Sequence, residues 1–281
     1  MRLSAGVLRN NMNALTTTLG RWRVSLLSCL LLGALGSVGY TQQPGLGTAF
    51  HPGERLDFEG KFGLIRLGRA SMEVLGVGPI RGEPASHFLL SISASLVGIY
   101  RLDDRFESWV SRDHDWSLRF VQEYDESNQQ RRNEYEIFPD SGYYRQSGTD
   151  SLFPTVSAPL DETALLYWVR TLSLEPGDTV VVDRYFRPDR NPVTIAVLER
   201  DTVDVPAGEF ASVVLHPVVP DGGLLFSPEA DARIWISDDE RRLVVQMKIK
   251  LLSHVTVTLR LEEFTQAEPP LSTPSPTDRV P

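Results

Sequence analysis

The chain has 281 residues, of which 41% are hydrophobic and 23% are charged, and its formal net charge is −9. This composition is close to that of an average globular protein, which excludes a largely disordered, collagen-like or coiled-coil chain. The acidic balance disfavours a nucleic-acid-binding protein, because such proteins present a basic surface. A single cysteine, Cys29, excludes an intramolecular disulfide bond and a CxxC metal site.

Residues 1–39 predict a secretory signal peptide. The segment contains four arginines and no acidic residue, and its basic part precedes the apolar run Val24–Val38. A basic flank, an apolar stretch and small residues at its end are typical of such signals. Ser37 and Gly39 fit the small positions before a cleavage site at Tyr40. We therefore expect an exported protein that is periplasmic or extracellular.

Two other interpretations of this leader stay open. An uncleaved membrane anchor would use the same apolar run, although the run is shorter than the ~20 residues that span a bilayer. A lipoprotein signal would use Cys29 in Leu26-Leu27-Ser28-Cys29, although a strongly apolar stretch continues beyond it. Met12 as the true start would shorten the basic region.

The charge of the chain changes once the leader is set aside. The remainder carries 24 basic and 37 acidic residues, a net charge of −13, and only three lysines, Lys61, Lys248 and Lys250. This net charge disfavours binding to phosphate backbones or anionic lipid surfaces.

The remainder divides into three segments. Residues 40–49 predict a linker, and residues 50–264 predict a single β-rich domain without internal repeats. Residues 265–281 contain five prolines and no aromatic residue, which predicts a disordered tail.

Alternation of apolar and polar residues predicts most of the domain as β-strands. Leu56, Phe58 and Phe62 alternate with polar residues, and the same pattern recurs over 245–251 and 255–261. Further strands are expected near 64–75, 86–100, 105–112, 116–125, 131–138, 141–146, 178–187, 192–200, 209–219 and 231–237. Many half-buried strands joined by short turns favour a mostly β fold: a large, curled antiparallel sheet, half-barrel or barrel-like. Gly76-Val77-Gly78 predicts a hairpin turn.

Residues 161–172 predict one amphipathic helix packed on this sheet. Leu165, Trp168 and Leu172 follow helical spacing, and Asp161 is suited to the N-cap. We expect Trp168 to make the contact with the sheet. The absence of strand–helix alternation excludes Rossmann and TIM-barrel folds.

Motifs of known chemistry are missing from the sequence. It has no GxxxxGK[ST] or GxGxxG phosphate loop and no GxSxG nucleophile motif. The five histidines do not pair as HxH or HExxH, so no metal site is expected. Asp238-Asp239-Glu240 predicts the polar connection of a hairpin. We expect no cofactor.

Several short motifs together resemble one family. The combination is similar to the domain-of-unknown-function 3108 family of exported bacterial proteins and covers most of residues 50–264. Leu243 and the Leu251–His254 stretch depart from the pattern, where members often have a proline and a glycine. The resemblance implies an exported, mostly β protein and brings no catalytic residues. The motifs are Pro52–Leu56, Gly63–Gly68, Pro159–Asp161 with Tyr167 and Arg170, Pro176–Asp178, Pro206–Phe210, and Trp235–Asp239 with Arg241 and Arg242.

Our main hypothesis is a non-enzymatic protein of the cell envelope. By analogy with lipoprotein carriers, its curled sheet would bind an apolar or amphipathic, lipid-like ligand or a segment of an envelope protein. We expect neither nucleic acid nor metal as partner. The candidate ligand-facing residues are Phe58, Phe62, Leu96, Trp109, Phe120, Tyr144, Trp168, Trp235 and Met247.

Two alternatives belong to other functional classes. An envelope hydrolase would need two carboxylates in one cleft, one of them with a raised pKa. A purely structural or assembly protein would use exposed sheet edges and the proline-rich tail.

Overall fold

The computed structural model describes residues 45–96, 100–127, 129–220, 226–252 and 255–266. The predicted signal peptide, Cys29 and residues 267–281 of the predicted tail lie outside these ranges. Within them, no helix is both long enough and apolar enough to span a bilayer.

A single antiparallel sheet dominates the described residues. It has 14 strands, which confirms the expected mostly β fold. The strands are β1 (Arg55–Phe62), β2 (Ile65–Ile80), β3 (Glu83–Leu96), β4 (Tyr100–Ser111), β5 (Ser117–Glu126), β6 (Gln129–Phe138), β7 (Tyr143–Gln146), β8 (Leu152–Pro154), β9 (Thr179–Val182), β10 (Val193–Val205), β11 (Gly208–Val218), β12 (Arg233–Ser237), β13 (Val244–Leu252) and β14 (Val255–Thr265).

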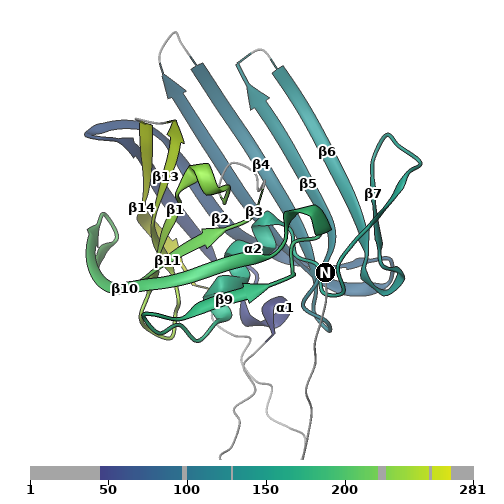
Figure 1. Ribbon diagram of the computed structural model, residues 1–281. Helices are drawn as coiled ribbons and strands as arrows, with labels where there is room; N and C mark the ends of the chain where they lie inside the picture. The colour runs from purple at the N-terminus through teal and green to yellow at the C-terminus, as the bar shows by residue number, and fades with distance from the viewer. Residues whose placement is uncertain (1–44, 97–99, 128, 221–225, 253–254, 267–281) are drawn as a thin grey trace, which may run out of the picture. The chain divides into compact units, whose positions relative to one another are not determined.

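The order of the strands places the ends of the domain sequence in the middle of the sheet. It runs β8-β7-β6-β5-β4-β3-β2-β1-β14-β13-β12-β11-β10-β9, so β1 pairs with β14 and the edges are β8 and β9 (Figure 1). The sheet curls but does not close. A parallel bridge between Leu160 and Tyr185 joins the segments that follow the two edge strands.

Two short helices accompany the sheet. Helix α2 (Glu162–Trp168) continues as a 3₁₀ turn over Val169–Thr171, which confirms the predicted helix. It packs against β3 and β4 on the inner side of the curl (Figure 1). Asp161 is its N-cap, as expected, and accepts a hydrogen bond from the Ala164 N–H at 2.9 Å. Helix α1 (Leu46–Ala49) lies where the sequence predicts a linker, and Leu46 is buried in the core.

The hairpin connections follow the sequence in one place and differ in another. The Asp238–Glu240 connection lies between β12 and β13, where Asp239 accepts a hydrogen bond from the Ser237 hydroxyl at 2.8 Å. The turn predicted at Gly76-Val77-Gly78 is wrong, because these residues lie inside β2 and pair with β3. The β2–β3 pairing absorbs a bulge between Val74 and Gly76, and the turn follows at Arg81-Gly82.

Candidate functional site

The predicted ligand-facing residues divide into groups with different surroundings. Phe58, Phe120, Tyr144 and Met247 are buried in the common hydrophobic core. Phe62 is exposed at the β1–β2 tip. The side chain of Leu96 lies outside the described residues.

The three tryptophans of that set do not share one face. Trp109 alternates with the buried Phe106 and Val110, so it lies on the outer face, stacked on His87 with ring centroids 4.2 Å apart. Trp235 lies under Lys248, whose Nζ is 4.8 Å from the ring centroid, and donates its N–H to Asp201. Trp168 is half-buried beneath the Arg184 guanidinium.

Helix α2 fills the inner side of the sheet where it packs on β3. Tyr167, rather than Trp168, makes the deepest contact: its ring stacks on Phe88 with centroids 4.2 Å apart. Arg170 follows, with a fully buried side chain that donates to Glu54 at 2.7 Å and to the carbonyl of Arg242 at 2.8 Å. The helix is therefore buried on more sides than an amphipathic pattern indicates.

Two buried carboxyl groups have perturbed proton affinities. Burial raises the pKa of Asp161 to about 6, although hydrogen bonds from Ser108 and Ser117 and the helix N–H groups oppose the shift. Burial likewise raises the pKa of Asp104 to about 6. One Asp104 oxygen accepts from the Asp125 N–H at 3.2 Å, and the other has no partner among the described residues.

Among the described residues, these two carboxyl groups are not brought together in either of the grooves below. Asp161 is engaged as a helix cap, and Asp104 lines neither of the two grooves described below. The carboxylates of those grooves are held by arginines or a serine: Asp57 and Glu73 by Arg55, and Asp103 by Ser93 and Arg101.

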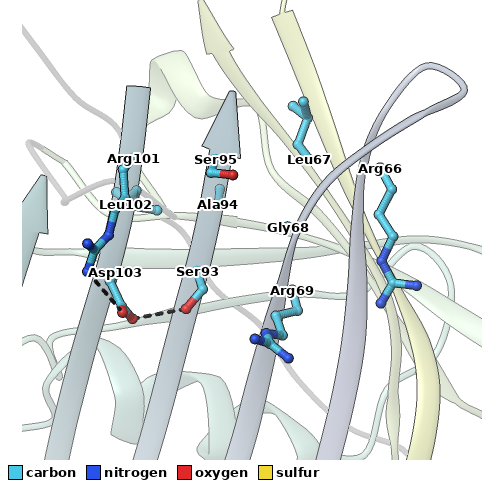
Figure 2. A pocket seen from close by; sticks show the side chains of 10 residues that line it. All are labelled: Arg66, Leu67, Gly68, Arg69, Ser93, Ala94, Ser95, Arg101, Leu102 and Asp103. Carbon is cyan, nitrogen blue, oxygen red and sulfur yellow. Dashed lines mark hydrogen bonds and ion pairs between the residues drawn. The ribbon is translucent and has the colours of Figure 1, made fainter. Parts of the chain in front are cut away.

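The outer face of β1–β4 carries two adjoining grooves of about 600 Å³ and 310 Å³. They share Arg69 and Ser93, and we call them together the arginine groove. Figure 2 shows the larger groove, where β2 diverges from the β3–β4 hairpin. Five arginines and three carboxylates line the arginine groove: Arg55, Arg66, Arg69, Arg101 and Arg105, with Asp57, Glu73 and Asp103.

Alternation along the strands produces this groove. Its residues on β2 and β3, among them Arg69, Ser71, Ser91 and Ser93, alternate with core residues such as Met72 and Leu90. Serines and Gly68 leave the floor low between the long arginine side chains. At Gly68 a Cβ atom would lie 2.1 Å from the Ser93 carbonyl oxygen, so only glycine permits β2 and β3 to approach this closely.

Arg69 is the cation without a partner in the groove. It faces Glu59 across the β1–β2 pair. That carboxylate already binds Lys61 at 2.9 Å and Arg260 at 3.1 Å, with Arg66 at 3.9 Å. Arg69 is exposed, and the described residues provide it with neither an ion pair nor a hydrogen bond. A planar guanidinium in this state matches a carboxylate or phosphate group.

The sequence-based search missed the arginine groove because it sought motifs and apolar faces. The alternating pattern did contain a signal, since the polar positions are arginine, serine and glutamate over residues 69–73 and serine alone over residues 91–95. Which strands lie side by side, and hence which arginines gather, follows only from the pairing.

The fold is that of a mostly β protein with a curled, open antiparallel sheet around a short helix. Within this class, the chain belongs to the family described as Protein of unknown function (DUF3108), whose sequence profile matches residues 57–260. This confirms the resemblance noted from the short motifs. A comparison with curated proteins gave no match.

Three solved structures share parts of this architecture. A beta-barrel-like protein of the domain of unknown function DUF1849 from Brucella abortus is 9% identical, with a TM-score of 0.48, over 78% of this chain and 99% of its own. A lipoprotein candidate from Parabacteroides distasonis is 12% identical, with a TM-score of 0.33, over 77% and 98%. An exported-protein candidate with a YmcC-like fold from Bacteroides fragilis is 12% identical, with a TM-score of 0.31, over 77% and 99%. With TM-scores below 0.5, these similarities carry no inference about function.

Proposed function

We propose that this chain is an exported, non-enzymatic protein that binds an anionic, amphiphilic component of the cell envelope through the arginine groove. Export rests on the basic and apolar leader at residues 1–39. The observation that carries the binding function is the exposed, unpaired guanidinium of Arg69 at the junction of the two grooves.

The groove favours an anion over a cation or a neutral ligand. Five arginines and three carboxylates line it. Three of the other arginines also pair with carboxylates beside the groove, so Arg69 supplies its unpaired positive charge. The Ser91 hydroxyl on the floor can donate to the same anionic group. The shared chemistry of the ligand is a phosphate or carboxylate, whether on a lipid headgroup or on a soluble molecule.

The test measures binding of short-chain phosphatidylglycerol and of free glycerol phosphate by calorimetry. Loss of a charged hydrogen bond to Arg69 should weaken binding about tenfold or more in Arg69→Ala. Arg69→Lys should retain part of the affinity, because it keeps the charge without the planar fork. The matched control is Arg132→Ala, an exposed, ion-paired arginine on β6 that lies outside the arginine groove.

Each outcome bears on the proposal. Tighter binding of the lipid than of glycerol phosphate supports an amphiphilic ligand, and equal binding supports recognition of the anionic group but excludes a role for its chains. Binding of neither probe, or equal affinities of wild type and Arg69→Ala, would overturn the groove as the site.

A further inference from the structure

The tip of the β1–β2 hairpin is apolar and exposed. Leu64 is 100% exposed, Ile65 60% and Phe62 39%. Gly63 has a φ of 58° at the first position of the two-residue turn, which hairpin turns of the Gly-X kind require. The turn chemistry therefore needs only the glycine, and a polar residue at Leu64 would satisfy the hairpin equally well. A fully exposed leucine here points to a surface that becomes covered.

A row of cations crosses the outer face directly behind this tip. Strand register places Arg66, Lys61, Thr258, Lys248 and Arg233 side by side on β2, β1, β14, β13 and β12. Directly opposed residues of neighbouring strands share a face. In Figure 1, the β1–β2 hairpin lies at the end of the sheet where β13 ends and β14 begins. We call this set the cationic row.

All three lysines of the chain lie in or beside the cationic row, at one end of the sheet. Lys61 and Lys248 belong to the row. Lys250 lies two residues farther along β13, nearer the end of that strand, on the same face of the sheet. Lys248 and Lys250 are exposed and, among the described residues, have no carboxylate within ion-pair distance. Behind the row, the next residues on this face are Arg69, Glu59, Arg260, Gln246 and Trp235, which add two more cations and one carboxylate.

Two of the three carboxylates that pair with the row lie on the side away from the tip. Lys61 binds Glu59, which precedes it by two residues on β1, and Arg66 binds Glu262 with two hydrogen bonds of 3.0 and 2.7 Å. Arg233 is the exception, because it binds Asp231, which precedes β12 and lies nearer the tip end of the sheet. On β1 and β2, cations therefore remain closest to the apolar tip, even though the chain as a whole is acidic.

We propose that this end of the sheet docks on an anionic bilayer surface, with the Phe62–Ile65 tip inserted into the interface and the cationic row against the lipid headgroups. An apolar segment flanked by Lys61 and Arg66 has the amphipathic order of interfacial membrane anchors. Each cation near an anionic surface adds attraction that a neutral partner would not provide. The proposal goes beyond the ligand site of the arginine groove and does not depend on it.

The test uses the purified protein and vesicles of phosphatidylcholine with or without phosphatidylglycerol. Wild type should sediment with the anionic vesicles and more weakly with the neutral ones. Leu64→Asp with Ile65→Asp should lower this affinity about tenfold or more, since the two side chains no longer transfer from water. Leu152→Asp is the matched control, because Leu152 is 61% exposed on the edge strand β8, outside the tip. Lys248→Glu with Lys250→Glu should abolish the preference for anionic vesicles while circular dichroism stays unchanged.

A spectroscopic arm reports insertion directly. Leu64→Trp should show a blue-shifted emission with anionic vesicles and quenching by brominated lipid chains. An unshifted emission, or equal vesicle binding by wild type and the Leu64→Asp/Ile65→Asp variant, would overturn bilayer docking and favour a protein partner at the tip. Glycerol phosphate binding, measured on the same variants, keeps the two proposals separate: the tip variant should retain it, whereas Arg69→Ala should weaken it.

Discussion

The buried ion pair between Arg170 and Glu54 allows a sharp test of what stabilises the domain. We expect Glu54→Gln to destabilise the protein, although the amide keeps the size of the carboxylate. The Arg170 side chain is 0% exposed and the Glu54 side chain 9%, with Nη1 and Oε1 2.7 Å apart. The substitution leaves a guanidinium in the interior without its counter-charge.

The magnitude follows from what remains around the guanidinium. Breaking a buried pair by removing one partner costs about 3–5 kcal/mol. The Arg242 carbonyl, at 2.8 Å from Nε, and the Phe50 ring, at 4.2 Å from the guanidinium carbon, stay in place. Because these contacts still compensate part of the charge, we expect the lower end, about 3 kcal/mol, and a fall in Tm of about 6–12 °C.

Urea denaturation followed by tryptophan fluorescence measures this loss. Glu136→Gln is the control, because it removes an exposed ion pair with Arg145 and should cost under about 1 kcal/mol. Replacing both partners, as Glu54→Leu with Arg170→Met, should cost less than Glu54→Gln alone, since no charge is left buried. A loss below about 1 kcal/mol for Glu54→Gln, or a double variant less stable than both single variants, would refute the reasoning.

Three further predictions address buried acids and close backbone contact. The pKa of Asp104 is raised from 3.8 to about 6 in the folded protein. The protonated side chain therefore stabilises the fold at low pH, and this contribution is lost as the pH rises through about 6. Asp104→Asn should therefore raise the free energy of unfolding by up to about 3 kcal/mol at pH 7 and leave it unchanged near pH 3; a parallel pH profile would contradict this. Asp161→Ala removes the helix cap and the acceptor of two serine hydroxyls, so thermal unfolding should show a loss of about 2–4 kcal/mol, and a loss under about 0.5 kcal/mol would argue against it. Gly68→Ala should cost about 1–3 kcal/mol of stability and weaken glycerol phosphate binding. The control Gly78→Ala, with nothing within 4 Å of the added carbon, should change binding little. Equal effects of the two variants on binding would show that the close approach of β2 and β3 at Gly68 does not shape the groove.

Local patterns in the sequence were sufficient to predict most elements of the fold, although α1 and β8 were not predicted. Alternation of Leu56, Phe58 and their neighbours predicts strands because one face of each strand is buried. Asp161 predicts the start of α2 because its side chain can accept the free N–H groups of the first turn. Gly76 and Gly78 misled the prediction, since glycine also occurs at strand bulges where its missing side chain relieves the backbone.

The candidate surfaces could not be predicted in the same way. Lys61 and Lys248 lie far apart in the sequence and share a row only because β1 and β13 both pair with β14. The net charge of the chain disfavours an anionic partner. It is a sum over all residues, however, and does not show that cations gather at one end of the sheet. The burial of Arg170 also could not be predicted locally, because its partner Glu54 precedes β1 and the Phe50 ring beside it follows α1.

The pairing of β1 with β14 has a consequence for how the chain folds. The central seam of the sheet joins the first strand of the domain to the last, so most of its other strands can pair with their sequence neighbours before this seam forms. Pairing between such distant segments is slow, because the loop-closure entropy is lost before the contacts are gained. Both β1 and β13 keep an open edge until residues 255–265 have been synthesised. For a chain that we propose is exported, late completion of the sheet leaves time for translocation in an extended state.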